Sequence, residues 1–457
     1  MIELRLAEIA SAVSGMAAVG GDETVDSVVT DSRAVAPGAL FVAVPGEHAD
    51  GHDYVAQAQD RGAVCSLVSR PVAGPHILVG DTVQALGLLA AEVVRRSTAT
   101  VVAVTGSSGK TTTKDLLAQV LAGRGEIVAP VGSYNNEIGV PLTACRVTET
   151  TTHLVLEMSA RDVGHIRYLT RIAPPDIAVV LNVGVAHLGV FGSRERIAQA
   201  KGELVESLTP QGIAVLNGDD RAVAAMANRC AGRVVLYGET RSATYRATAV
   251  TLDDSGRPQF TLHTPYGDAP VALALVGQHM VGNALACAAV ACELGMPVAD
   301  VAAALTEARG ASRWRMEVRS SPAGFTVIND AYNANTESMI AALKALKSLP
   351  GRSWAVLGPM AELGESATDE HIRIGQLVVR LGIDKLVTVG PGAKVMHDAF
   401  LLEGSLPDDA TYVEDVDAAV VFLTSALREG DVVLVKASRS AGLERIALSL
   451  TPDGGST

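Results

Sequence analysis

The segment that most constrains the fold of this chain is a strand, a glycine turn and a helix in direct succession. An apolar run from Thr100 ends at Thr105, Gly-Ser-Ser-Gly follows, and Lys110 opens a helix that we predict to end near Leu121. Glycines let such a turn curl until its backbone N–H groups point at phosphate oxygens, and the helix N-terminus adds partial positive charge. The order of these elements predicts a phosphate-binding loop inside an α/β unit.

Two side chains give this loop its chemistry. Lys110 can reach the terminal phosphates of a nucleotide, and the Thr111 hydroxyl can ligate Mg²⁺. The strict phosphate-loop pattern has a glycine where this chain has Val104, so an ordinary glycine turn before a threonine-rich helix is the alternative. The strand before and the helix after favour phosphate binding. The nucleotide-binding residues predicted in the loop are Thr105, Gly106, Ser107, Ser108, Gly109, Lys110, Thr111 and Thr112.

The rest of the chain alternates strands and helices as an α/β protein does. Near-continuous Val, Ile and Leu runs such as HLVLE and GIAVLN lie between helical stretches, which indicates a parallel sheet buried on both faces. A length of 457 residues corresponds to three domains of ~150 residues. We predict a mixed α/β N-terminal domain at 1–97, a central domain at 98–312 with a P-loop-type, mostly parallel sheet flanked by helices, and a Rossmann-like C-terminal domain at 313–457.

Bulk composition excludes several classes of protein. Hydrophobic residues make up 48% and charged residues 19%, which argues against a disordered chain. A formal net charge of -13 argues against nucleic-acid binding as the main activity. The longest uncharged stretch, 269–292, is interrupted by glycine and polar residues, so we expect a strand, a loop and a buried helix there and no membrane span. Five scattered cysteines without a C-x-x-C pair suit reduced thiols in a cytoplasmic enzyme.

Three residues downstream of the loop are candidates for metal chemistry. Glu157 and His187 both follow apolar runs, and doubly wound folds place their ligands at the carboxyl ends of strands. A carboxylate there can hold Mg²⁺, whereas a histidine is an unusual ligand for that ion, so a structural role for His187 stays open. Lys201 lies on a predicted helix, where an exposed lysine is the plainer interpretation.

Polar turns supply further candidates for binding. Asn and Asp are frequent in turns for local reasons, so surface turns remain the alternative. The candidates are Ser32 and Arg33 in the loop 30–33, the loop 45–53, and the turn residues Asn135, Asn136, Asp330, Asn333 and Asn335.

Taken in order, the motifs TGSSGKTTTK, EMSARDVGHI, NVGVAHLGVFGS and AQAKGE resemble those of the Mur ligase family, the ATP-dependent, amide-forming enzymes of peptidoglycan synthesis. The resemblance covers essentially the whole chain. It implies ATP and two Mg²⁺ ions as cofactors, with Thr111, Glu157, His187 and Lys201 at the metals and Lys201 carbamylated by CO₂. Together with Lys110, the last three are the implied catalytic residues.

Other motifs are most similar to those of family members that join D-alanyl-D-alanine to UDP-N-acetylmuramoyl-tripeptide. They are TDSR with LFVAVPGEHADGHDY, YNNEIGVPLT, GQHMVGNALA, NDAYNANTESM and VLVKASRSAGLERI. The resemblance implies that Asn283, Arg313 and Asp330 border the adenosine of ATP. The substrate-binding residues that it implies are Ser32, Arg33, Asn135, Asn136, Ser159, Tyr332 and Asn333. The alternatives are the preceding ligase, which adds the third amino acid, and a non-catalytic sugar-nucleotide-binding protein.

The resemblance also implies a mechanism. The terminal carboxylate of the tripeptide attacks the γ-phosphate of ATP to give an acyl phosphate, and the amine of D-alanyl-D-alanine then displaces phosphate. A cytoplasmic monomer is the implied state. Four residues depart from common family patterns: Ser159 stands for Gly, Gly189 for Glu, Thr336 for Pro, and Pro359 interrupts an LGDM-like run.

Overall fold

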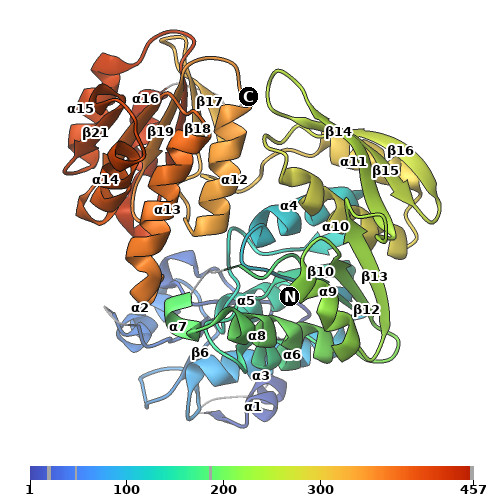
Figure 1. The fold of residues 1–457 in the computed structure, drawn as a ribbon. Helices are drawn as coiled ribbons and strands as arrows, with labels where there is room; N and C mark the ends of the chain where they lie inside the picture. The colour runs from blue at the N-terminus through green and yellow to red at the C-terminus, as the bar shows by residue number, and fades with distance from the viewer. Residues whose placement is uncertain (18–21, 47–48, 185–187, 453–457) are drawn as a thin grey trace.

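The computed structural model describes residues 1–17, 22–46, 49–184 and 188–452. Its three main sheets follow one another along the chain, and Figure 1 shows them in blue, in cyan to yellow, and in orange to red. We call residues 1–97 the first segment, 98–312 the central segment and 313–457 the third segment. The predicted three-part α/β fold is confirmed, while the domain boundaries at 97 and 312 stay predictions.

The first segment is a small mixed sheet with helices. Its elements are β1 (Leu4–Arg5), α1 (Leu6–Ala12), β2 (Met16–Ala17), β3 (Thr24–Val25), β4 (Ser27–Val29), β5 (Ala39–Val42), α2 (Val55–Asp60), β6 (Cys65–Val68), β7 (His76–Leu78) and α3 (Thr82–Arg96). Strands β4 to β7 are parallel, and β2 pairs antiparallel with β7. Helix α3 begins where the Asp81 carboxylate accepts the Val83 and Gln84 N–H groups, and it buries Leu86, Leu89 and Val93.

The central segment carries the large sheet. Its elements are β8 (Thr100–Thr105), α4 (Lys110–Leu121), β9 (Glu126–Val128), α5 (Gly139–Ala144), β10 (Thr151–Glu157), α6 (His165–Ile172), β11 (Ile177–Val180), α7 (Leu188–Phe191), α8 (Arg194–Glu206), β12 (Ile213–Asn217), α9 (Arg221–Ala224), β13 (Arg233–Gly238), β14 (Tyr245–Leu252), β15 (Pro258–Thr264), β16 (Gly267–Ala272), α10 (Met280–Glu293) and α11 (Val298–Glu307). The strand order is β16-β15-β14-β13-β12-β11-β8-β10-β9, parallel from β9 to β14. The uncharged stretch 269–292 is the end of β16, a loop and the buried helix α10, as predicted.

The third segment is a second α/β sheet. Its elements are β17 (Glu317–Ser320), β18 (Thr326–Asn329), α12 (Thr336–Lys347), β19 (Ser353–Leu357), α13 (Ala367–Arg380), β20 (Lys385–Val389), α14 (Lys394–Leu402), β21 (Ala410–Val413), α15 (Val416–Ala426), β22 (Val432–Lys436) and α16 (Glu444–Leu450). Strands β18 to β22 are parallel, and β17 runs antiparallel at one edge. Helix α12 is capped by Asn335, the residue before it, whose side chain accepts the Ser338 N–H.

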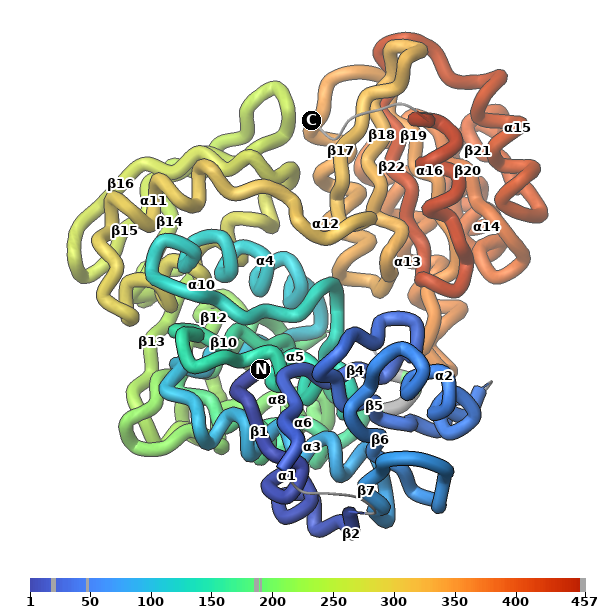
Figure 2. The backbone as a smooth tube through the Cα atoms, turned by 180° about the vertical axis from the view of Figure 1, so that it is seen from behind, coloured from blue at the N-terminus to red at the C-terminus, as the bar shows by residue number. Residues whose placement is uncertain are grey.

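The strand order positions the site. In the central sheet β8 lies between β10 and β11, with Glu157 level with Val104 and Val180 level with Thr105. The loops that leave these three strands therefore meet at one edge, which is where parallel sheets bind ligands. In Figures 1 and 2 this edge lies between the first segment below and the third segment above.

Among the described residues, the buried hydrophobic clusters join the first segment to the central one but not to the third. One buried cluster contains side chains of α1 and α3 together with side chains of α5, α6 and α8, so it crosses from the first segment into the central one. The buried residues of two other clusters come only from the third segment. Within the residues that the structure describes, no helix has the length and apolar character that a membrane span requires.

Candidate active site

The phosphate loop has the geometry that its sequence predicts. Gly109 adopts φ +80°, a conformation that favours glycine, and an added Cβ would lie 2.8 Å from Asn283 Oδ1. Helix α4 begins at Lys110, and the Lys110 ammonium donates to the Gly106 carbonyl at 2.8 Å. The loop opens into a cavity of about 720 Å³. The loop residues that line it are Ser107, Ser108, Gly109, Lys110, Thr111 and Thr112, whereas Thr105 is buried in the strand.

Asn182, which sequence reasoning missed, holds the loop in place. Its side-chain oxygen accepts the Ser107 N–H at 2.8 Å and the Ser108 N–H at 2.9 Å, and its amide donates to the Ser108 carbonyl. The residue follows β11, the strand beside the loop. Its position at the carboxyl end of a predicted strand was the available signal, because polar residues there face the ligand edge.

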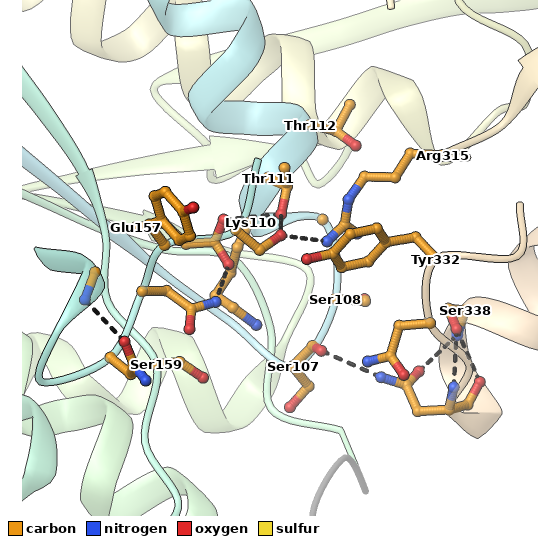
Figure 3. Close-up of a pocket in the computed structure, with 18 of the residues that line it drawn as sticks. Ser107, Ser108, Lys110, Thr111, Thr112, Glu157, Ser159, Arg315, Tyr332 and Ser338 are labelled. Carbon is orange, nitrogen blue, oxygen red and sulfur yellow. Dashed lines mark hydrogen bonds between the residues drawn. The ribbon is translucent and has the colours of Figure 1, made fainter. Parts of the chain in front are cut away.

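Glu157 and Thr111 form an oxygen-rich pair beside the loop (Figure 3). Glu157 is 1% exposed, and its carboxylate accepts from the Thr111 hydroxyl at 2.8 Å and from the Asn135 amide at 2.6 Å. The Thr111 hydroxyl also lies 2.9 Å from the Ser133 hydroxyl. Because Mg²⁺ prefers oxygen ligands and is commonly held through one or two carboxylates with a nucleotide, these residues fit that ion.

Lys201 is buried and does not line the cavity. The interpretation of Lys201 as an exposed helix residue is therefore wrong. Burial lowers the pKa of its amine well below the ordinary value, and the Lys110 charge lowers it further. A neutral amine is the form that reacts with CO₂, so the surroundings suit carbamylation. His187, the other predicted metal residue, lies outside the described residues.

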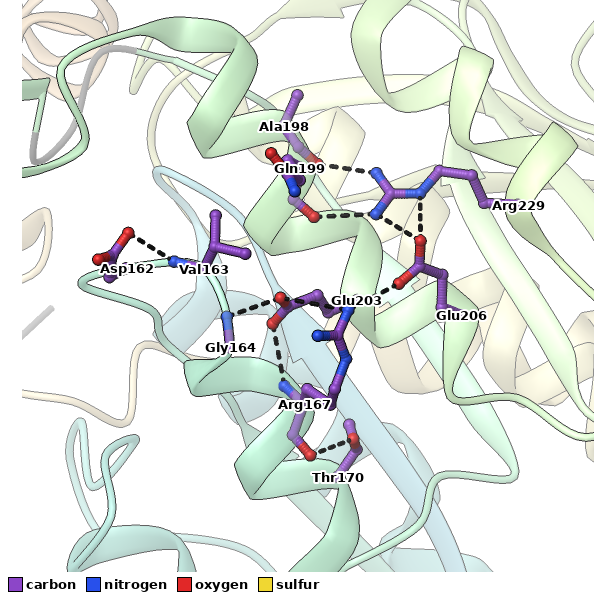
Figure 4. A network of polar contacts seen from close by, with 10 residues as sticks. All are labelled: Asp162, Val163, Gly164, Arg167, Thr170, Ala198, Gln199, Glu203, Glu206 and Arg229. Atoms are coloured by element: carbon purple, nitrogen blue, oxygen red, sulfur yellow. Dashed lines mark hydrogen bonds and ion pairs between the residues drawn. The ribbon is translucent and has the colours of Figure 1, made fainter.

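A polar network fixes the helix that carries Lys201 (Figure 4). The buried Glu203 carboxylate accepts the backbone N–H groups of Gly164 at 2.6 Å and Arg167 at 3.1 Å, which caps α6. One turn later, Glu206 pairs with Arg229, whose guanidinium also donates to two carbonyls of α8. These contacts hold α8, the helix that carries Lys201, against α6 and the segment after α9.

The third segment supplies the opposite wall of the cavity. The buried Lys436 ammonium donates to Asp330 Oδ2 at 2.5 Å and to the Asn333 carbonyl at 2.9 Å. The Asn335 amide crosses to the Ser107 carbonyl of the phosphate loop at 3.2 Å. The predicted residues Asp330, Tyr332 and Asn333 line this wall, and the remaining predicted residues that line the cavity outside the phosphate loop are Asn135, Asn136, Glu157, Ser159 and Asn283.

A histidine of the central segment that was not predicted also lines this part of the cavity. Burial lowers the pKa of His279 to about 4, partly opposed by the Asp330 charge. At neutral pH the imidazole is therefore uncharged, and it can donate or accept a hydrogen bond without adding charge beside Lys436.

Arg315, and not the predicted Arg313, faces the cavity. Its guanidinium donates to the Ser133 hydroxyl at 2.6 Å and lies 4.2 Å from the centre of the Tyr332 ring, while Arg313 is exposed and does not line the cavity. The φ angle of Trp314 is +60° and that of Met316 is +51°, both left-handed. This irregular backbone decides which arginine turns inward, and no sequence period could have shown it.

The predicted UDP-sugar residues lie apart from the cavity. The Ser32 hydroxyl donates to Gln57 Oε1 at 2.7 Å, and the exposed Arg33 pairs with Asp31 at 2.8 Å. From the described part of the first segment, Thr30 lines the cavity. Neither the buried Ser32 nor the exposed Arg33 lines the cavity, and their binding role stays a prediction.

Comparison with known proteins places this architecture in a family. Three family models match consecutive parts of the chain: the Mur ligase family catalytic domain at 24–95, the Mur ligase middle domain at 104–291, and the Mur ligase glutamate ligase domain at 314–439. The chain is 48% identical to the UDP-N-acetylmuramoyl-tripeptide–D-alanyl-D-alanine ligase of Mycobacterium tuberculosis, over 99% of this chain and 98% of that protein. The chain belongs to the Mur ligase family.

Solved structures of relatives have the same fold. One is the UDP-N-acetylmuramoylalanyl-D-glutamyl-2,6-diaminopimelate–D-alanyl-D-alanyl ligase of Acinetobacter baumannii, with a TM-score of 0.86 and 30% identity over 98% of both chains. Another is the MurF ligase of Thermotoga maritima in complex with ADP, with a TM-score of 0.82 and 31% identity over 93% of this chain and 96% of that chain.

Proposed function

We propose that this protein is the ATP-dependent ligase that joins D-alanyl-D-alanine to UDP-N-acetylmuramoyl-tripeptide in peptidoglycan precursor synthesis. The observation that carries the proposal is one cavity in which Lys110 and Thr111 of a phosphate loop lie with the buried Glu157, with walls from all three segments. The activity is the one that the names of its relatives print, at 48% identity over almost the whole chain.

The first step activates a carboxylate, which does not acylate an amine by itself. A carboxylate oxygen of the tripeptide attacks the γ-phosphorus of ATP, the bond to the β,γ-bridging oxygen breaks, and an acyl phosphate and ADP result. Lys110 stabilises the charge that spreads over the transferred group, and the loop N–H groups orient it. Arg315, held by Ser133 and Tyr332 at the same wall, is placed to add a second positive charge.

The second step forms the amide bond. The amine of D-alanyl-D-alanine attacks the acyl carbon, a tetrahedral intermediate forms, and its collapse releases inorganic phosphate and the UDP-muramoyl-pentapeptide. Water competes with the amine for the acyl phosphate. A third segment that packs over the loop through Asn335 excludes water during this step.

Magnesium fits the oxygen donors that the structure shows. We propose one Mg²⁺ site at Thr111 and Glu157, and a second that involves His187 and Lys201. A bound Mg²⁺ would neutralise phosphate charge and align the attacking and leaving oxygens.

We also propose that Lys201 is carbamylated. Its burial and the motif AQAKGE support this, because a carbamate would place a negative charge where a second metal needs one. Mass spectrometry of the active enzyme should show an added mass of about 44 Da, that of CO₂, at Lys201. Lys201→Ala should lose activity, and bicarbonate should not restore it, whereas the activity of the wild type should depend on bicarbonate. Full activity of Lys201→Ala without bicarbonate would exclude the role.

The state of the working enzyme is a further part of the proposal. We expect a cytoplasmic monomer with domains at 1–97, 98–312 and 313–457. The five unpaired cysteines, four of them buried, support the reducing compartment. Size-exclusion chromatography with light scattering should give a mass near 47.2 kDa.

Phosphate release tests the function directly. We expect release from ATP in the presence of UDP-muramoyl-tripeptide and D-alanyl-D-alanine, and little without the dipeptide. Lys110→Ala should reduce turnover by about a hundredfold to a thousandfold while the fold is retained, because it removes a cation from the transferred phosphoryl group. Release that depends on a single amino acid would indicate the preceding ligase, and no release with all substrates would indicate a binding protein.

A further inference from the structure

One basic side chain of the cavity wall has no hydrogen-bond or ion-pair partner among the residues that the structure describes. Lys110, Arg315 and Lys436 are each hydrogen-bonded to described residues, as shown above. Arg161 also lines the cavity, and its guanidinium makes no hydrogen bond or ion pair with any residue that the structure describes. It is therefore available to a ligand without the loss of an existing contact.

The loop that carries Arg161 is held at both ends. It connects β10 to α6, and at its start the Ser159 N–H donates to the Asn135 carbonyl at 3.0 Å. At its end the Gly164 N–H donates to the buried Glu203 carboxylate at 2.6 Å, as Figure 4 shows. A loop fixed in this way loses little conformational entropy when a ligand binds, so Arg161 is presented in advance.

Asp162, the acidic residue next to Arg161 in the chain, pairs with a different arginine. Asp162 accepts the Val163 N–H and the Arg196 guanidinium, both at 2.8 Å, and these bonds hold its pKa below the ordinary value. Its charge is thus directed at Arg196 and not at Arg161. On the other side, His165 Nδ1 accepts the Arg161 backbone N–H at 3.3 Å, so a neutral ring carries its proton on Nε2 and can donate into the cavity that it lines.

The position suggests what binds there. Arg161 follows Glu157 by four residues, and Thr30 of the first segment lines the same cavity. If the proposed function holds, the reacting carboxylate lies at the phosphate loop and the rest of the substrate extends toward the first segment. The name of the Acinetobacter relative spells the peptide as alanyl-D-glutamyl-2,6-diaminopimelate, which contains carboxylates that do not react.

We infer that Arg161, with His165 beside it, binds a non-reacting carboxylate of the peptide part of the substrate. A guanidinium and a carboxylate can form two parallel hydrogen bonds, which gives both affinity and orientation. The two sources of such a carboxylate are the glutamyl residue and the side chain of diaminopimelate. This inference rests on the proposed function.

Steady-state kinetics of Arg161→Ala with three substrates tests it. The substrates are the diaminopimelate tripeptide, a lysine tripeptide that lacks the side-chain carboxylate, and a tripeptide with D-isoglutamine in place of D-glutamate. For the first, we expect the KM to rise about tenfold to a hundredfold, the range for a charge-assisted hydrogen bond, with kcat and the KM for ATP within about twofold. Arg161→Lys should recover part of the loss.

The lysine and D-isoglutamine tripeptides distinguish a role of Arg161 in substrate binding from a purely structural role. The effect of Arg161→Ala should shrink with the analogue that lacks the bound carboxylate, and that analogue identifies the source. An unchanged KM in Arg161→Ala, or an equal rise with all three substrates, would overturn the inference. Arg171→Ala, an exposed arginine of α6 outside the cavity lining, is the matched control and should behave as wild type. If wild type itself released no phosphate with tripeptide and dipeptide, the proposed function would fail instead.

Discussion

The first and third segments are attached to the central one by different kinds of contact. Leu89 and Val93 of α3 belong to the same buried cluster as Ile166 and Leu169 of α6, so the first segment shares a hydrophobic core with the central segment. The buried residues of two clusters come from the third segment alone, and polar bonds such as Asn335 to Ser107 and Arg315 to Ser133 join this segment to the phosphate-loop region.

This difference indicates which part of the molecule moves. Rotation of the first segment would expose apolar surface, at a free-energy cost of about 25 cal/mol per Å². Hydrogen bonds between the central and third segments can be exchanged for bonds to water, at a net loss of only about 0.5–1.5 kcal/mol each. We therefore expect the first segment to stay fixed and the third segment to open and close over the nucleotide.

The largest expected effect comes from breaking the shared core. Leu89→Ala should lower the free energy of unfolding of the first and central segments by about 2–5 kcal/mol, because it leaves a cavity in a fully buried site. Both tryptophans, Trp314 and Trp354, lie in the third segment, so fluorescence reports that segment while far-UV circular dichroism reports the whole chain. In urea, Leu89→Ala should shift the main dichroism transition and leave the fluorescence transition in place.

The matched variant is Leu423→Ala, which removes an equally buried leucine from the core of the third segment. Leu423→Ala should shift the fluorescence transition and leave the main dichroism transition unchanged. If each variant moved both transitions equally, the three segments would unfold as one unit, and the third segment would not be attached more loosely than the first.

A smaller effect is expected at the backbone contact between the central and third segments. Gly189 packs directly on Gly364, and a Cβ at Gly189 would lie 2.4 Å from the Gly364 nitrogen and 2.6 Å from its Cα. Gly189→Ala should therefore hold the third segment away and lower kcat about tenfold, which corresponds to about 1.4 kcal/mol, with an unchanged Tm. Gly123→Ala, where an added Cβ meets open space, is the control. Normal turnover in Gly189→Ala would mean that this contact is not needed for catalysis.

An effect of similar size on KM distinguishes the two arginines at the start of the third segment. Arg315→Ala should raise the KM for ATP about tenfold, since a charge-assisted hydrogen bond contributes about 1.5–3 kcal/mol, whereas the exposed Arg313→Ala should change it less than twofold. Kinetics at saturating tripeptide and dipeptide measure both. A larger effect at Arg313 would show that the backbone at 313–316 rearranges when nucleotide binds, and it would support the prediction that Arg313 borders the adenosine of ATP.

Much of the fold and part of the site could be predicted because they depend on local sequence. The phosphate loop follows from glycines between a β-branched strand and a helix, and the parallel sheets follow from continuous apolar runs. Glu157 was predictable in the same way, since it ends a buried strand, and the structure brings it to Thr111 across 46 residues of sequence. The depth at which Lys201 is buried was not predictable, because it depends on how α8 packs against α6.

What the sequence determined by itself was the class of chain and the loop that handles phosphate, because backbone preferences and hydrophobic periodicity act over a few neighbouring residues. Only the tertiary structure decided that Arg315 and not Arg313 faces the cavity, that Asn182 holds the loop, and that Ser32 lies apart from it. Gly189 departs from the family pattern in the sequence, and the structure explains it, because Gly364 packs so closely that a side chain at position 189 would clash with it. Such contacts join residues far apart in the chain, and their geometry depends on how whole elements pack.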